Sequence, residues 1–173
     1  MRSRRGPPRA GSERRLDAAR ARAVAFDLLS RKAWTRRELR ERLCRRGAPA
    51  PVAEAVVADL EARGYVNDRA FAGAWAETRA RGRAYGPRRL REALTAKGVA
   101  RPLVDEAIRQ AFAEADEEAQ ARAAAARRLP GIARGGPEQA ARRLSAYLLR
   151  RGFAGGIVRR VVRDVCAIEV SED

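Results

Sequence analysis

Three segments of the sequence match one another position by position: RELRERLCRRG at 37–47, RRLREALTAKG at 88–98 and RRLSAYLLRRG at 142–152. Each segment ends in a basic residue and a glycine, and leucines lie eight and four positions before that glycine. Leucines four positions apart lie on one face of a helix. A glycine directly after such a face is typical of the left-handed residue that ends a helix. The sequence therefore predicts a repeated helix that stops at Gly47, Gly98 and Gly152.

A second helix is expected after each glycine, and a further helix before each pair. Apolar residues recur five, nine, ten and thirteen positions after the first glycine, at Val52, Val56, Val57 and Leu60. Pro51 and Pro102 lie in the first turn of this later helix, where the missing N–H costs nothing. Thr35 and Glu38 form a capping box for the helix before Gly47. No segment has a convincing strand pattern, so we predict an all-α fold: a tandem array of three three-helix repeats, elongated and curved.

The repeat spacing also predicts where the parts of the chain begin and end. We expect a flexible basic arm at 1–15, repeats at 16–66, 67–115 and 116–168, and a tail at 169–173. A repeat of roughly 50 residues buries too little surface to be robust alone, so neighbouring repeats should support one another. Residues 130–136 are rich in glycine and predict a loop, the best candidate for a hinge.

The composition argues against enzyme chemistry. The chain has no histidine, which excludes Ser-His-Asp and Cys-His catalysis and histidine metal ligands. Its two cysteines make neither a zinc site nor a disulfide scaffold. The consecutive acids Asp116, Glu117 and Glu118 could bind a nuclease metal, but consecutive helical residues point in different directions, which favours a solvated helix cap. We therefore expect no catalytic residue, no metal and no cofactor.

The charge predicts an anionic partner. Of 173 residues, 38 are basic and 22 acidic, which leaves a net charge of +16. The excess favours the middle helix of each repeat, where one repeat position holds Arg37, Arg88 and Arg142. Any single arginine could simply lie on a solvated face. The predicted binding residues are Arg36, Arg37, Arg40, Arg88, Arg89, Arg91, Arg142, Arg143 and Arg150, and the predicted structural motif is Gly47, Tyr85, Gly86, Pro87, Gly98 and Gly152.

Several motifs resemble one known family. GYVNDRAFA at 64–72, then YGPRRL at 85–90 and KGV at 97–99, resemble the core of the RecX regulatory proteins. YLLRRGF at 147–153 is similar to the final repeat of that family. The resemblance covers about residues 23–166. This sequence differs from the family pattern at 123–126, where four alanines replace the bulkier residues expected in the first helix of the third repeat.

The resemblance implies a non-enzymatic modulator of the bacterial recombinase RecA. Such a protein binds in the groove of the RecA–DNA filament and, as a rule, inhibits the ATPase, strand-exchange and coprotease activities of RecA. We accordingly expect a cytoplasmic monomer with RecA–DNA as its partner, weak electrostatic contacts with DNA and no membrane association. The alternative is a general DNA-binding protein with tandem helix-turn-helix-like modules that acts without RecA. The third helices, however, have few residues suited to base recognition.

Overall fold

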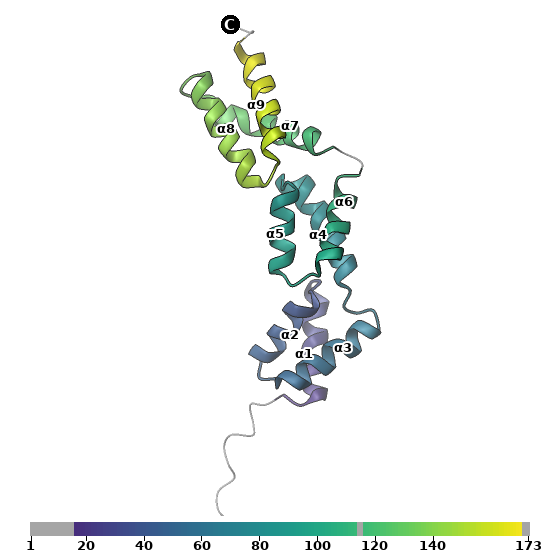
Figure 1. Ribbon diagram of the computed structural model, residues 1–173. Helices are drawn as coiled ribbons and strands as arrows, with labels where there is room; N and C mark the ends of the chain where they lie inside the picture. The colour runs from purple at the N-terminus through teal and green to yellow at the C-terminus, as the bar shows by residue number, and fades with distance from the viewer. Residues whose placement is uncertain (1–15, 114–115, 171–173) are drawn as a thin grey trace, which may run out of the picture. The chain divides into compact units, whose positions relative to one another are not determined.

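The computed structural model describes residues 16–113 and 116–170, and the chain divides into two compact units, 1–67 and 68–173. All regular structure in the described part of the chain is helical, as predicted, and Figure 1 colours it from purple α1 to yellow α9. The predicted arm at 1–15 and residues 171–173 of the predicted tail lie outside the described residues.

The first unit contains α1 (Ala18–Arg31), α2 (Arg36–Arg45) and α3 (Ala50–Ala62). Its middle helix begins as predicted, because Thr35 Oγ1 accepts a hydrogen bond of 3.1 Å from the N–H of Glu38. It ends at Gly47, whose φ of 98° is in the left-handed region. Leu39 and Leu43 are fully buried, so the leucine pattern correctly identified the core face of α2.

The second unit contains two further three-helix repeats. Its elements are α4 (Asp68–Arg83), α5 (Pro87–Ala96), α6 (Arg101–Ala111), α7 (Glu117–Arg128), a short 3₁₀ turn (Leu129–Gly131), α8 (Pro137–Arg151) and α9 (Gly155–Val170). One hydrophobic core lies among α4 to α6 and another among α7 to α9. The repeated leucines at 90, 94, 144 and 148 are fully buried in these cores. The final helix continues to Val170, beyond the predicted start of the tail at 169.

The segment after α7 differs from its prediction. We expected residues 130–136 to be a loop, but the 3₁₀ turn extends to Gly131, and Ile132 is only 6% exposed. Ile132 packs in the core of the third repeat together with Leu129. The loop prediction is wrong for the start of this segment, because one apolar side chain among the glycines anchors it to the core.

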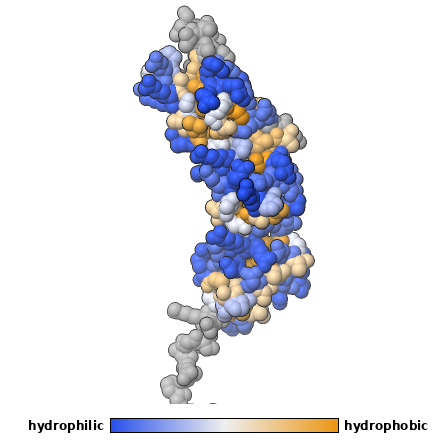
Figure 2. All heavy atoms as spheres, in the orientation of Figure 1, coloured by the Kyte–Doolittle hydropathy of each residue, from blue (hydrophilic) through white to orange (hydrophobic). Residues whose placement is uncertain are grey.

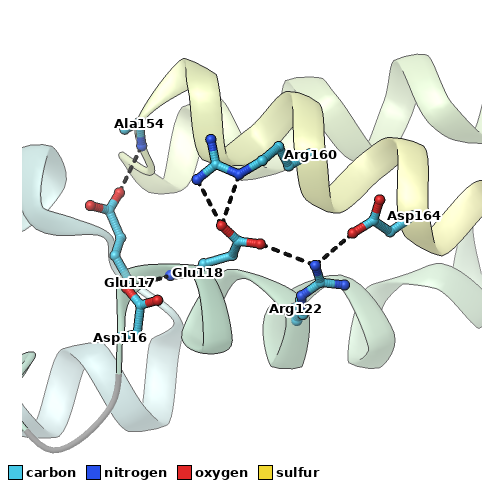
Figure 3. A network of polar contacts seen from close by, with 7 residues as sticks. All are labelled: Asp116, Glu117, Glu118, Arg122, Ala154, Arg160 and Asp164. Atoms are coloured by element: carbon cyan, nitrogen blue, oxygen red, sulfur yellow. Dashed lines mark hydrogen bonds and ion pairs between the residues drawn. The ribbon is translucent and has the colours of Figure 1, made fainter.

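The alanine-rich helix α7 packs closely against α9. Ala121, Ala124 and Ala125 are at most 1% exposed, and their small side chains allow this close approach. The three acids at the start of α7 are engaged in capping contacts and ion pairs. Asp116 caps α7 by accepting from the N–H of Glu118 at 3.3 Å, and Glu117 accepts from the N–H of Ala154 at 2.8 Å, next to the start of α9 (Figure 3).

Glu118 is the centre of an ion-pair network between α7 and α9 (Figure 3). It binds Arg160 of α9 at 2.7 Å and Arg122 of its own helix at 3.0 Å, and Arg122 also binds Asp164 at 2.6 Å. The hydrogen bonds from Arg160 and Arg122 lower the pKa of Glu118. Asp164 and then Glu118 raise the pKa of Arg122. The network therefore supplies polar contacts where the alanines of α7 supply little apolar surface.

The start of α5 meets the end of α8 in a backbone contact that we call the glycine joint. The N–H of Gly86 donates to the carbonyl of Arg151 at 2.7 Å, and the N–H of Arg88 donates to the carbonyl of Gly152 at 3.2 Å. A Cβ on Gly86 would lie 2.6 Å from backbone atoms of Gly152 and Phe153. With a φ of −76°, Gly86 could be any residue on conformational grounds. Glycine is required there because two backbones approach closely.

The core of the third repeat includes a residue from outside its three helices. Ala84, directly after α4, is 4% exposed and packs in the core of α7 to α9. Its φ of 52° is uncommon for a residue other than glycine. The side chain of Arg151 reaches back to the same segment, where its Nη1 donates to the carbonyl of Arg83 at 2.9 Å. The second and third repeats are therefore joined by both packing and hydrogen bonds.

We predict that Gly86→Ala destabilises the second unit by about 1–3 kcal/mol, the usual cost of overpacking, because backbone atoms must move. Gly82→Ala is the matched control, since a Cβ there meets nothing within 4 Å and alanine favours a helix by at most about 1 kcal/mol. Urea unfolding followed by circular dichroism measures both changes. An unfolding midpoint for Gly86→Ala equal to that of the wild type would contradict the role of the glycine joint.

We also predict a pH-dependent contribution from Glu118. Because its pKa in the folded protein lies below the ordinary 4.5, the stabilisation is complete above that pH and is lost as the pH falls through the lower folded value. Glu118→Gln should lower the urea midpoint at pH 7, and the difference from wild type should shrink at acid pH. The control is Glu77→Gln, which removes an exposed i,i+4 pair with Arg81 and should change the pH 7 midpoint much less. If the difference in urea midpoint between Glu118→Gln and the wild type stayed constant as the pH fell, Glu118 would make no pH-dependent contribution to stability.

Candidate functional site

The predicted arginines lie on or at the ends of α2, α5 and α8, the middle helices of the three repeats. All of them are exposed except Arg36, which is half-buried. Hydrophilic residues cover most of the face seen in Figure 2, and hydrophobic residues form smaller areas between them. An exposed arginine that already pairs with a carboxylate of the protein gains less from a new partner, so the ion pairs rank these arginines by availability.

On α2, the predicted arginines all have carboxylate partners. Arg37 binds Glu41 at 2.8 Å, and this hydrogen bond lowers the pKa of Glu41. Arg36 binds Glu61 at 2.5 Å and also contacts Glu54 of α3. Arg40 lies 3.8 Å from the same Glu54 carboxylate. Acidic residues of the first unit therefore pair with all three predicted arginines of α2.

On α5, the pairing is similar but looser. Arg88 binds Glu92 at 3.2 Å, and Arg91 lies 3.4 Å from Asp105 of α6. Arg89 is 4.0 Å from Glu92, at the outer limit of an ion pair. Arg89 is consequently the least neutralised of the three predicted arginines on this helix.

On α8, the predicted arginines have no such partners. Among the residues that the structure describes, no carboxylate lies within 4.0 Å of Arg142, Arg143 or Arg150. Arg143 instead donates to the carbonyl of Arg134 at 2.9 Å. The sequence explains part of the difference, because Glu41 of α2 and Glu92 of α5 lie six positions before their repeat glycine, where α8 has alanine. Among the predicted arginines, those of α8 therefore carry the most available positive charge.

A cavity of about 670 Å³ adjoins the glycine joint. Its lining residues are Tyr85, Arg89, Arg128, Tyr147, Arg150 and Arg151. Tyr85 directly precedes Gly86, and Arg151 directly precedes Gly152, so the joint brings these two side chains together. We call this cavity the arginine pocket. None of its lining residues is acidic.

Cation–π contacts order the side chains of the arginine pocket. The guanidinium carbons of Arg89 and Arg151 lie 5.7 and 5.8 Å from the ring centroid of Tyr85. Arg151 and Arg128 lie 5.0 and 5.6 Å from the ring centroid of Tyr147. Three guanidinium groups thus lie over two tyrosine rings, within the range of cation–π attraction, which restrains these side chains. Such a set can bind anions through charge-assisted hydrogen bonds.

The sequence did not predict the arginine pocket. Three of its six lining residues, Tyr85, Arg89 and Arg150, are among the residues named from the sequence, and the structure brings them together. The other three were not named. Two of them, Tyr147 and Arg151, lie on the same helix as Arg150 and are four residues apart, so helical spacing places them on one face. No sequence pattern identifies Arg128 as a lining residue, because its position depends on how α7 packs against the other helices. The other predicted arginines, at 36, 37, 40, 88, 91, 142 and 143, do not line the pocket.

The described residues show neither a metal centre nor a membrane span. No group of three or more cysteine, aspartate or glutamate side chains in 16–113 and 116–166 is placed to hold a metal ion. Within the same ranges, no helix is both long enough and apolar enough to cross a membrane. The features that stand out in this part of the chain are therefore the exposed arginines and the arginine pocket.

Comparison with known proteins places these repeats in one family. Models of the first, second and third three-helix domains of RecX match residues 21–60, 67–108 and 116–162. The regulatory protein RecX of Streptomyces coelicolor is 39% identical over 153 residues, which cover 88% of this chain and 81% of that protein. The RecX of Thermobifida fusca is 40% identical over 160 residues, which cover 92% and 85%. A crystal structure of RecX from Lactobacillus salivarius superposes with a TM-score of 0.73 at 16% identity and covers 86% of this chain and 96% of that one. The chain belongs to the RecX family of regulatory proteins.

Proposed function

We propose that this chain is a non-enzymatic regulator of RecA that binds in the groove of the RecA–DNA filament and inhibits the ATPase, strand-exchange and coprotease activities of RecA. Membership of the RecX family supports a regulatory role. The observation that carries the proposal is the set of predicted arginines on α8, none of which has a carboxylate within 4.0 Å among the described residues.

The physical basis is attraction between these arginines and a partner with repeated negative charge. A filament groove that contains DNA presents phosphates at regular intervals, and each arginine that contacts a phosphate releases a condensed counterion. Arginines already paired with Glu41, Glu54 or Glu92 gain less from such a contact, because a partner must first displace the carboxylate. We therefore assign the larger share of binding to Arg142, Arg143 and Arg150 of α8, and a smaller share to the predicted arginines of α2 and α5.

The alternative is a DNA-binding protein that acts without RecA. Binding to bare DNA and to RecA-coated DNA separates the two functions at the same salt concentration. The proposed function requires tighter binding to the coated DNA, whereas the alternative requires equal or weaker binding to it.

We predict that increasing amounts of this protein lower the DNA-dependent ATPase rate of RecA and that the inhibition weakens as salt is raised. Steady-state ATP hydrolysis with saturating single-stranded DNA measures the effect. An ATPase rate that does not change at any ratio of the two proteins would remove the support for RecA inhibition.

We further predict that Arg142→Gln/Arg143→Gln weakens binding to the RecA–DNA filament by on the order of tenfold, because two charge-assisted contacts are lost. The matched control is Arg109→Gln/Arg127→Gln, which removes the same charge from exposed arginines outside the predicted set. Anisotropy of the fluorescently labelled protein titrated with preformed filaments measures both affinities. Equal losses in the two variants would show that only net charge matters and would contradict a binding face on α8.

A further inference from the structure

We propose that the arginine pocket at the glycine joint binds the phosphates of a DNA strand. This inference deepens the proposed function by naming a ligand and a place for it, but it does not depend on RecA. The pocket has a volume of about 670 Å³, within the roughly 300–1,000 Å³ of typical ligand sites. Arg142 and Arg143 are not among its lining residues.

The charge of the pocket favours an anion. Four guanidinium groups line it and no lining residue is acidic, so the arginines repel one another when the pocket contains only water. Within the described residues, the one carboxylate that pairs with any of them is Glu92, at 4.0 Å from Arg89. The repulsion among the four guanidinium groups therefore persists in the unliganded pocket. A bound anion relieves it.

Three of the four lining arginines have contacts that restrain them before a ligand arrives. Arg151 donates to the carbonyl of Arg83 at 2.9 Å and stacks on both tyrosine rings, which leaves its other N–H groups available. Arg128 stacks on Tyr147, and Arg89 stacks on Tyr85. Because these side chains are already ordered, less conformational entropy is lost when they bind. Arg150 completes the set with neither an ion pair nor a ring contact among the described residues.

A phosphodiester strand fits this arrangement better than a single carboxylate does. The arginines come from three helices, with Arg89 on α5, Arg128 on α7, and Arg150 and Arg151 on α8. One carboxylate has two oxygens and one charge, and it cannot satisfy four guanidinium groups that start from different helices. Successive phosphates of a strand each offer two oxygens, and arginine binds them in a bidentate manner. Phosphate is therefore the ligand chemistry that we assign, with DNA as its source.

Binding at this position also has a structural consequence. The ligand would contact arginines on both sides of the glycine joint, because Arg89 belongs to the second repeat and Arg150 to the third. A ligand that binds only the folded state stabilises the second unit. This stabilisation grows with the logarithm of the ligand concentration once the concentration exceeds the dissociation constant. DNA should consequently hold the second and third repeats together, and this effect provides a readout besides affinity.

The test compares two double variants of the full chain without RecA. Arg128→Gln/Arg150→Gln removes two charges from the pocket. Arg45→Gln/Arg46→Gln removes two exposed arginines of the first unit, and Arg45 occupies the same repeat position as Arg150. The probe is a fluorescently labelled oligothymidine of about twelve nucleotides, a length that single-strand sites commonly cover. Anisotropy titrations over a range of salt concentrations give the affinity and its salt dependence, and thermal unfolding with and without the probe gives the stabilisation.

We expect the pocket variant to bind on the order of tenfold more weakly than the control variant. The slope of log affinity against log salt should fall by about 1.4 in the pocket variant, at roughly 0.7 for each lost phosphate contact. The probe should raise the unfolding temperature of the wild type and of the control variant, but much less that of the pocket variant. Pyrophosphate should displace the probe, and polyglutamate of equal total charge should not.

Three results would overturn the proposal. Equal weakening in both variants would mean that the pocket is not the site. Displacement by polyglutamate as effective as by pyrophosphate would mean that the pocket does not select phosphate. Binding of thymidine monophosphate as tight as binding of the oligonucleotide would identify a free nucleotide, not a strand, as the ligand. None of these results bears on inhibition of the RecA ATPase, which is measured separately.

Discussion

The left-handed glycine that ends the middle helix of each repeat is the constraint on which the rest of the fold depends. Gly47, Gly98 and Gly152 have φ angles of 98°, 83° and 88°, a region that other residues adopt only with strain. The carbonyl of Gly47 accepts from the N–H of Leu16, and that of Gly152 accepts from the N–H of Arg88. The glycine at this repeat position therefore ends the middle helix. In the first and third repeats its carbonyl also accepts a hydrogen bond from a segment much earlier in the chain.

Ion pairing gives the three repeats different electrostatic roles although their sequences match. Surface ion pairs contribute little to stability, but they determine which arginines remain available to a partner. The pairs formed by Arg37 and Arg88 with glutamates four residues later have no counterpart at Arg142, because Ala146 replaces the glutamate. A single substitution in the repeat pattern thus changes the surface of α8 without changing its buried leucines. A net charge of +16 does not by itself reveal this difference.

The sequence predicted those features that depend on residues close together along the chain. Leu39, Leu90 and Leu144 are all fully buried, because helical periodicity alone determines which face is apolar. The ion pairs between helices, such as Arg36 with Glu61, depend on packing and were not predicted. The arginine pocket was not predicted for the same reason, since its residues come from three helices and Arg128 reaches it from α7. Ile132 was missed because the glycines around it suggested a loop.

The position of Ala84 has a consequence for the order in which the protein is made. Chains leave the ribosome from the N-terminus, and domains generally fold as units as they emerge. Ala84 is synthesised before α7 to α9, yet its methyl group belongs to their core. The carbonyl of Arg83 likewise lacks its hydrogen-bond donor until Arg151, 68 positions later in the chain, has been synthesised. The second repeat therefore leaves the ribosome with an apolar residue and a carbonyl group unmatched, and its border with the third repeat is completed only when synthesis is nearly finished.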